Sequence, residues 1–239
     1  MQFIAASSST GYGNLGSLAE AKSTANSHGL LGFAYLTGYL LDAEVNIFSA
    51  SGWGVSRGWN TGGAISETQN IPAAYEYYAI DASNRVVTEQ GKWDHSDYIP
   101  DVVVVNLGTN DFNASGYNSM SAENKALLEA RFIQDYTTFL IKLNNWYPNA
   151  VIIVAYGLMG EANTLEDFTL SAVDLANDEI GREAVHPFIM EAAGTAPNAF
   201  GSGYHPNVGT SKNVAEDLAA LINELTGREV VRTMITGSN

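Results

Sequence analysis

The stretch VVVVNLGTNDF, residues 102–112, joins an apolar run directly to a polar turn. Its four consecutive valines are β-branched and do not alternate with polar residues, which predicts a strand buried on both faces at Val102–Leu107. Strands of this kind belong to parallel sheets that helices cover on each side. The stretch therefore favours an α/β fold.

Other runs of the same character lie on either side of this one. Further buried strands are expected at Met1–Ala6, Val45–Ser49, Val151–Tyr156 and Ala184–Met190. Between the strands, the clearest amphipathic helix is Ala122–Trp146, whose apolar residues recur every three to four positions: Leu127, Leu128, Phe132, Tyr136, Phe139, Leu140 and Leu143. A last helix is expected at Ser211–Leu225, with Gly227 as its stop signal. The alternation predicts a three-layer α/β/α fold around a parallel sheet of about five strands.

The chain length and composition bound the organisation. At 239 residues, with 46% hydrophobic and 15% charged residues, the chain suits one well-buried α/β domain spanning residues 1–239. No repeat or linker divides it. No apolar run approaches the roughly 18 residues that span a bilayer, and no signal peptide is visible in the chain.

The charge balance narrows the possible partners. Eleven Lys and Arg against 26 Asp and Glu give a net charge of −15, which disfavours nucleic acid and anionic membranes and favours a neutral substrate. The absence of cysteine excludes disulfides, thiolate zinc sites and a cysteine nucleophile. The four scattered histidines show no metal-ligand spacing, so no metal or other cofactor is expected.

Four segments near strand ends, or before the last helix, carry groups suited to acyl transfer: AASSSTGYG (5–13), SASGWGVSRGW (49–59), NLGTNDF (106–112) and GYHPN (203–207). A hydroxyl nucleophile needs a base that takes its proton and donors that face the developing oxyanion. These segments offer Ser7, His205, the Gly52 backbone N–H and the Asn110 side chain for those tasks.

In these segments the sequence resembles the SGNH (GDSL-type) hydrolases, and most closely carbohydrate esterase family two, which removes acetyl groups from plant polysaccharides. NLGTNDF matches the third family block, GYHPN the fifth, and SGWGVSRG the second as that esterase family has it. WDHSDYIPDVVVVNLGTND contains the family's WD…PD lead-in. Aligning the glycine-tyrosine-glycine at residues 11–13 with the first block places Ser7 on the nucleophile. The resemblance covers nearly the whole chain, although the family's β-sandwich domain before the first block is absent here.

The resemblance also assigns roles. It implies a Ser7 nucleophile, a His205 base and an oxyanion hole made of the Ser7 and Gly52 backbone N–H groups with the Asn110 amide. Gly54 is the alternative backbone donor. Ser8, Ser9 and Asp111 are expected to be structural. His186 also precedes a proline but lies in an expected strand, so His205 is favoured over it, as it is over His28 and His95.

Two departures from the family pattern concern the catalytic residues. Ala5-Ala6-Ser7 replaces Gly-Asp-Ser, and Ser202 stands where most of these enzymes have an Asp three residues before the histidine. Members of carbohydrate esterase family two often lack that Asp, so the resemblance implies a Ser–His dyad in which a backbone carbonyl, that of Tyr204 or a neighbour, orients the imidazole. The imidazole is then expected to titrate not far from its free pKa of about 6.5. Asp94 or Asp97 is the alternative, as a distant acid that completes a triad.

Aromatic residues gather in the same segments. Tyr12, Trp53, Trp59 and Tyr204 are expected to bind substrate, because sugar C–H groups pack on exposed rings. Trp93 is expected in the core. The sequence thus predicts an esterase that removes O-acetyl groups from a xylan- or glucomannan-type polysaccharide and is secreted to reach it. The alternatives are a lipid or thioester hydrolase, an acetyltransferase, or a carbohydrate-binding protein without activity, which the loss of Gly-Asp before Ser7 suggests.

Overall fold

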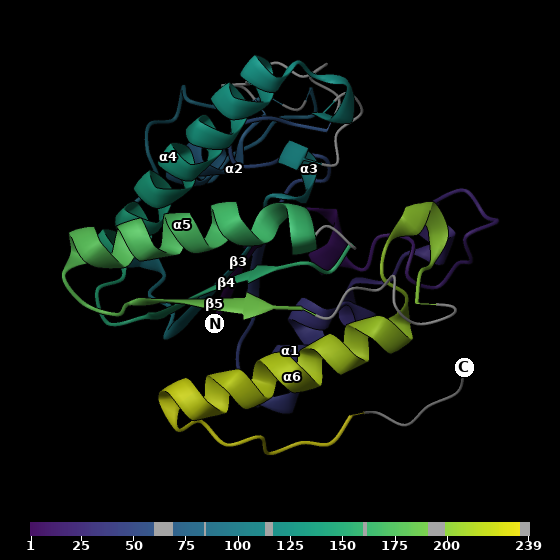
Figure 1. Ribbon diagram of the computed structural model, residues 1–239. Helices are drawn as coiled ribbons and strands as arrows, with labels where there is room; N and C mark the ends of the chain where they lie inside the picture. The colour runs from purple at the N-terminus through teal and green to yellow at the C-terminus, as the bar shows by residue number, and fades with distance from the viewer. Residues whose placement is uncertain (60–68, 84, 113–116, 160–161, 191–198, 235–239) are drawn as a thin grey trace.

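The computed structural model describes residues 1–59, 69–83, 85–112, 117–159, 162–190 and 199–234 (Figure 1). Five parallel strands form one sheet in the order β2-β1-β3-β4-β5. Their bounds are β1 Gln2–Ala5, β2 Asn46–Ser49, β3 Val102–Asn106, β4 Val151–Tyr156 and β5 Val185–Ile189. All five predicted strands are therefore confirmed. No observed strand end lies more than one residue from the predicted end.

Helices cover both faces of this sheet. They are α1 Phe33–Leu40, α2 Ile71–Tyr77, α3 Thr109–Phe112, α4 Ala122–Trp146, α5 Ala162–Ile180 and α6 Val208–Thr226. Helices α4 and α5 pack together on one face, and α1 and α6 pack together on the other (Figure 1). The predicted three-layer α/β/α fold is confirmed. None of the helices among the described residues combines the length and the apolar character needed to cross a membrane.

The valine run of β3 contributes to both cores, as its unbroken apolar pattern predicts. Successive side chains of a strand point to opposite faces. Val103 and Val105 therefore pack in the cluster beneath α4 and α5, whereas Val102 and Val104 pack in the cluster beneath α1 and α6. All four are buried. A polar residue at any of these positions would lose hydrogen bonds to water, which is why the run contains none.

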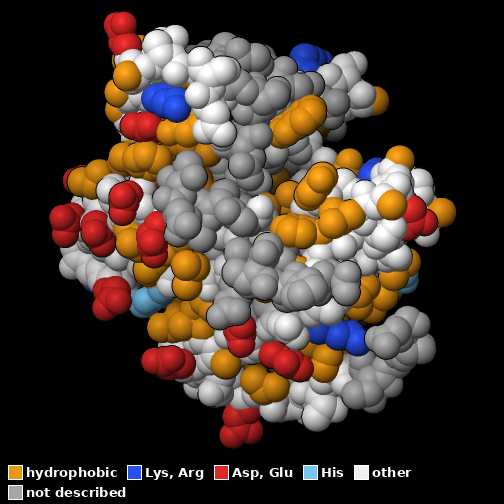
Figure 2. Space-filling view, turned by 45° about the vertical axis from the view of Figure 1, so that its right-hand side comes forward, with side chains coloured by type: hydrophobic (Ala, Val, Ile, Leu, Met, Phe, Trp, Pro, Cys, Tyr) orange, Lys and Arg blue, Asp and Glu red, His pale blue; other side chains and the backbone are white. Residues whose placement is uncertain are grey.

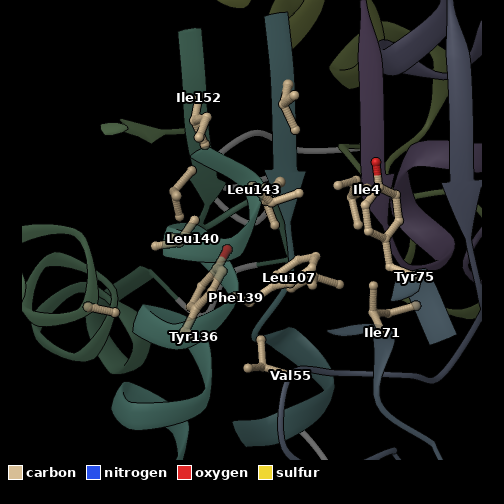
Figure 3. Close-up of a cluster of buried hydrophobic side chains, with 14 of the residues drawn as sticks. Ile4, Val55, Ile71, Tyr75, Leu107, Tyr136, Phe139, Leu140, Leu143 and Ile152 are labelled. Carbon is tan, nitrogen blue, oxygen red and sulfur yellow. The ribbon is translucent and has the colours of Figure 1, made fainter. Parts of the chain in front are cut away.

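Helix α4 supplies one large part of the core. Its Tyr136, Phe139, Leu140 and Leu143 gather beneath the sheet in Figure 3 and are fully buried. Burial of one such side chain stabilises a fold by about 1.5–3 kcal/mol. Leu127 was predicted on this face but is 60% exposed, because it lies one position from Leu128 and so is turned about 100° away around the helix.

Two helix starts depended on capping that the apolar pattern does not reveal. Helix α6 begins at Val208, before the expected Ser211, because the Asn207 side chain accepts a hydrogen bond of 2.9 Å from the Thr210 N–H. Helix α2 forms in a segment that had little periodicity, where the Asn70 side chain accepts from the Ala73 N–H at 2.8 Å.

Trp93 also differs from its prediction. It was expected in the core, but its side chain is 39% exposed, and its indole stacks on Tyr78 with ring centroids 5.2 Å apart.

The strand register positions the candidate site. Ala5 of β1 pairs with Ser49 of β2 on one side and with Asn106 of β3 on the other. Three strands consequently end at the same edge of the sheet, and the segments that follow them meet there. In open parallel sheets this carboxyl edge is where ligands bind.

Candidate active site

Ser7 and His205 meet beyond the carboxyl end of β1. The Ser7 Oγ lies 2.7 Å from His205 Nε2. Ser7 follows the extended residue Ala6 and opens a short 3₁₀ helix, Ser7–Thr10, whose Thr10 hydroxyl donates to the Ser7 carbonyl at 2.8 Å. The Ser7 side chain is mostly buried, and His205 is half-buried. The structure therefore brings together the two residues that the sequence proposed as nucleophile and base.

The second imidazole nitrogen has a backbone partner. His205 Nδ1 lies 2.8 Å from the Gly203 carbonyl oxygen, so Nδ1 carries the proton and Nε2 is left to accept from the Ser7 hydroxyl. The orienting carbonyl belongs to Gly203 rather than to Tyr204. Gly203 and Tyr204 both have positive φ, +63° and +60°, and this tight turn directs the carbonyl back at the ring.

No carboxylate among the described residues forms an ion pair or hydrogen bond with His205. Asp94 instead caps the short helix His95–Asp97 by accepting from the Ser96 N–H. Ser202 is fully buried and turned away from the imidazole. Its hydroxyl accepts from Asn26 Nδ2 at 3.0 Å and donates to the Ser17 carbonyl at 3.3 Å.

The pKa of His205 is lowered from its ordinary value. Burial is the largest cause, because it disfavours the charged imidazolium. The hydrogen bond to Gly203 acts in the opposite direction, and the positive charge of Lys22 lowers the pKa further. The sequence had predicted a value close to that of free imidazole; it did not reveal how far the ring is enclosed.

Gly52 and Asn110 line the same cavity as Ser7 and His205. Asn110 donates one of its two amide hydrogens to the Trp53 carbonyl at 2.7 Å, which leaves the other for a ligand. Gly52 has a φ of +80° at the turn after β2. Gly54, the alternative donor, does not line the cavity and is packed so closely that a Cβ would collide with Asp111. The geometry therefore favours Gly52 over Gly54.

Asp111 holds the loop that carries Gly52. Its carboxylate is fully buried and accepts three backbone N–H groups, from Val55 at 2.9 Å, Ser56 at 2.8 Å and Arg57 at 3.1 Å. Burial raises the pKa of Asp111 to about 6, and the three N–H groups oppose that rise. These contacts agree with the structural role expected for Asp111. Because Asn110 and Asp111 are adjacent in α3, one short helix positions both the amide and the loop.

Asn106 is a site residue that sequence reasoning missed. At the end of β3, its Oδ1 accepts from the Ser8 hydroxyl at 2.9 Å and from the Ser9 hydroxyl at 3.4 Å, and its Nδ2 donates to the Ala155 carbonyl at 3.0 Å. It also lines the cavity. Asn106 thus ties the turn of the nucleophile to the sheet, and Ser8 and Ser9 are structural as expected. The one available signal was a polar residue ending the valine run.

The cavity beside Ser7 measures about 400 Å³, and aromatic side chains line part of it. Trp59 is 53% exposed, Tyr204 is 67% exposed and Tyr12 is half-buried, and all three line it. The prediction for Trp53 is wrong: its side chain is 2% exposed, belongs to the core under α4 and does not line the cavity. Trp53 contributes to the site through its backbone carbonyl, which accepts the hydrogen bond from Asn110, while its side chain packs into the core.

The remaining histidines lie in other surroundings. His95 is buried and stacks on the rings of Tyr75 and Trp146. His186 lies in β5, 3.6 Å from a Glu183 carboxylate oxygen, and His28 is exposed at the surface. Within the described ranges, no three His, Asp or Glu side chains come together as a metal site requires.

The chain has relatives among carbohydrate esterases. No protein-family model matches it. A cellulase/esterase, CelE, of Acetivibrio thermocellus is 28% identical over 232 residues, which are 95% of this chain and 26% of the relative. An acetylxylan esterase/glucomannan deacetylase of Cellvibrio japonicus is 29% identical over 125 residues, which are 52% of this chain and 30% of the relative. The chain therefore spans less than a third of the length of either relative.

Solved structures of esterases share the fold of this chain. An acetyl xylan esterase of the rumen bacterium Butyrivibrio proteoclasticus superimposes with a TM-score of 0.80 at 24% identity, covering 95% of this chain and 64% of that one. GDSL-like lipases are among the solved structures that share the fold. A family two carbohydrate esterase of Clostridium thermocellum superimposes with a TM-score of 0.76 at 25% identity, covering 95% of this chain and 64% of that one. The resemblance to the SGNH (GDSL-type) hydrolases, and within them to carbohydrate esterase family two, is thus confirmed by sequence relatives and by fold.

Proposed function

We propose that this chain is a serine esterase that removes O-acetyl groups from a xylan- or glucomannan-type polysaccharide through a Ser7–His205 dyad. The observation that carries the proposal is the 2.7 Å contact between Ser7 Oγ and His205 Nε2 at the edge of an open cavity. The names of the two relatives, a cellulase/esterase and an acetylxylan esterase/glucomannan deacetylase, support the substrate class.

In the first half of the reaction, Ser7 Oγ attacks the acetyl carbonyl while His205 Nε2 takes its proton. The carbonyl oxygen becomes an oxyanion, which the Ser7 and Gly52 backbone N–H groups and the free Asn110 amide hydrogen stabilise. The Gly203 carbonyl accepts from Nδ1–H and stabilises the imidazolium as it forms. His205 then gives the proton to the sugar oxygen, the C–O bond breaks, and the sugar hydroxyl leaves an acetyl-Ser7.

The second half repeats the sequence with water. His205 takes a proton from a water molecule, which attacks the acetyl carbonyl through a second oxyanion held by the same donors. Collapse of this intermediate breaks the bond to Ser7 Oγ, which recovers its proton from His205, and acetic acid leaves and ionises to acetate in solution. The imidazole carries each proton that moves to or from Ser7, the sugar oxygen and the attacking water, so the cycle needs no cofactor.

The surroundings of the dyad suit a neutral sugar polymer. Trp59 and Tyr204 expose ring faces at the rim of the cavity, and sugar C–H groups pack on such faces. Acidic side chains (red) dominate the charged groups on the face in Figure 2, which disfavours anionic lipid surfaces. A polymer outside the cell is reached only by a secreted enzyme, so we propose that this one acts there.

Acetate release from acetylated xylan and acetylated glucomannan, beside turnover of 4-nitrophenyl acetate, tests the proposal directly. Release from the polymers is expected to be lost in Ser7→Ala. Faster turnover of long-chain esters or thioesters than of acetylated xylan would instead indicate a lipid or thioester hydrolase. Transfer of acetyl to an added sugar in place of water would indicate an acetyltransferase, and binding without turnover would indicate a carbohydrate-binding protein.

The pH dependence of kcat/KM follows from the state of His205. Since the base must be neutral to accept a proton, kcat/KM is expected to fall as the pH drops through the pKa of His205 and to be level above it. Because burial lowers that pKa, the midpoint is expected below the free value of about 6.5. A midpoint above 7, or a profile that His205→Ala leaves unchanged, would contradict the assignment.

Ser202→Ala separates a dyad from a triad. Its hydroxyl contacts Asn26 and Ser17 rather than the imidazole, so kcat is expected to stay within about three-fold of wild type, whereas loss of a triad acid costs around 10⁴ in kcat. The free energy of unfolding is expected to fall by about 1–2 kcal/mol, because Asn26 loses a buried acceptor. A large fall in kcat with unchanged stability would show that Ser202 serves the base.

A further inference from the structure

One face of the His205 imidazole is covered by an aromatic ring. The Tyr12 and His205 ring centroids lie 4.2 Å apart with 34° between the ring planes. The Lys22 ammonium lies over the Tyr12 phenol ring, 4.6 Å from its centre. Ammonium, phenol and imidazole thus make consecutive contacts beside the nucleophile.

Tyr12 restrains a movement that the hydrogen bonds of His205 leave open. Bonds from Nε2 to Ser7 and from Nδ1 to Gly203 fix the two ends of the imidazole. They do not prevent the ring from tilting about the line between its nitrogens. A flat ring at van der Waals distance opposes that tilt, and such aromatic contacts are worth about 0.5–1.5 kcal/mol beyond the area they bury.

A backbone hydrogen bond connects the segment that carries Tyr12 to the segment that carries His205. Gly13, beside Tyr12, accepts a hydrogen bond of 2.9 Å from the Ser202 N–H, in the segment that carries His205. Gly11 and Gly13 have φ of +71° and +63°, and a Cβ on Gly11 would collide with the His28 carbonyl. Only glycine adopts these conformations at such close approach. The glycine-tyrosine-glycine turn is therefore built to hold Tyr12 against His205.

Lys22 is the charged group that acts on His205. Besides His205 itself, the titratable side chains among the described lining residues of the cavity are Tyr12 and Tyr204, and none of these lining residues is a carboxylate. Lys22 lies behind Tyr12 and does not line the cavity. Glu20, close to Lys22 in sequence, accepts from the Ser17 N–H and hydroxyl instead. In a chain of net charge −15, Lys22 thus places a local positive charge beside the base, and a positive charge disfavours a second one on the imidazole.

We propose that Tyr12 and Lys22 are positioning residues for the base: Tyr12 holds the imidazole plane, and Lys22 keeps the resting imidazole neutral in moderately acidic medium. This inference rests on the proposed function and deepens it, since it explains how a base without a carboxylate partner stays oriented and ready to accept a proton. It also gives Tyr12 a role beyond the substrate contact that the sequence suggested.

An NMR titration of His205 tests the pair without reference to ester hydrolysis. The ring proton of His205 is followed against pH in wild type, Lys22→Met, Tyr12→Phe and Tyr12→Leu, with the resonance identified by its loss in His205→Gln. The contacts of 4.2 Å and 4.6 Å place the Lys22 ammonium at most about 9 Å from the imidazole centre, so removal of its charge is expected to raise the pKa of His205 by about 0.3–0.6 at low ionic strength. In 1 M salt, where the Debye length is about 3 Å, most of that shift is expected to vanish.

Lys125→Met is the matched control. Lys125 lies 5.0 Å from the centre of the Tyr117 ring, the same type of contact, and neither residue lines the cavity. This variant is expected to leave the pKa of His205 unchanged. Equal titrations for wild type and Lys22→Met at low salt would overturn the role of Lys22, and an equal shift in Lys125→Met would do the same.

Kinetics then test the role of Tyr12. Tyr12→Leu is expected to lower plateau kcat about 10–100-fold through a misaligned base. Tyr12→Phe keeps the ring and is expected to restore most of that loss. The acid limb of kcat/KM is expected to move with the pKa measured by NMR. Wild-type kcat in Tyr12→Leu would overturn the positioning role. If no ester is turned over while the NMR shifts occur as expected, the proposed function fails and the electrostatic contact stands.

Discussion

Replacing Ser7 by alanine is expected to lower kcat for acetyl ester hydrolysis by about 10⁴–10⁶-fold, because nucleophile and base act as one unit and neither works alone. The Ser7 hydroxyl is the one that His205 Nε2 contacts, at 2.7 Å. Without it, no acetyl-enzyme forms, and only the oxyanion donors remain to assist water. KM is expected to change little, since the hydroxyl contributes more to the transition state than to substrate binding.

Ser8→Ala is the matched control for Ser7→Ala. Ser8 is the next residue, lines the same cavity and is also a serine, but its hydroxyl donates to Asn106 rather than to an imidazole. It is expected to keep kcat within about ten-fold, since it loses one structural hydrogen bond. Labelling with a fluorophosphonate followed by peptide mass mapping is expected to modify Ser7. Modification of Ser8 or Ser9 instead would contradict the assignment.

Asn110→Ala is expected to lower kcat by about 10²–10³-fold, the usual effect of losing one oxyanion donor. One amide hydrogen is held by the Trp53 carbonyl, which orients the other towards the cavity before substrate arrives. A donor that is already oriented costs no reorganisation when charge develops. The effect is therefore expected in kcat, with KM nearly unchanged.

The bond to Trp53 means that Asn110→Ala also removes a structural contact, so two measurements accompany it. The free energy of unfolding is expected to fall by about 1–3 kcal/mol, because the Trp53 carbonyl loses its partner. In a Ser7→Ala background, the same substitution is expected to lower the residual rate by less than in wild type, since the donors and the nucleophile serve one transition state. Wild-type kcat in Asn110→Ala, with stability reduced, would show that the amide is only structural.

Local sequence was enough to predict the five strands and the two helices with the clearest apolar faces, α4 and α6. The four valines of β3 predicted a strand buried on both faces, and its side chains do divide between the two cores. The period of α4 predicted Ala122–Trp146 to the residue, because a long amphipathic helix is determined by its own apolar face. Helix α2 was not predicted and the start of α6 was placed too late, because each depends on a single capping side chain, Asn70 or Asn207.

By itself, the sequence determined the parallel α/β sheet and the segments that meet at its carboxyl edge, since both depend on residue pattern along the chain. The pairing of Ser7 with His205 was expected from the resemblance to the SGNH hydrolases. Only the tertiary structure decided which atoms surround the pair. The Asn106 amide beneath the nucleophile turn and the Tyr12 ring on the imidazole join residues far apart in sequence. The Gly203 carbonyl is close to His205 in sequence, but it reaches Nδ1 only because Gly203 and Tyr204 both adopt positive φ. Trp53 was misjudged for the same reason: whether a loop aromatic faces core or solvent depends on the path of the turn and on the helix packed against it, and no local pattern encodes either.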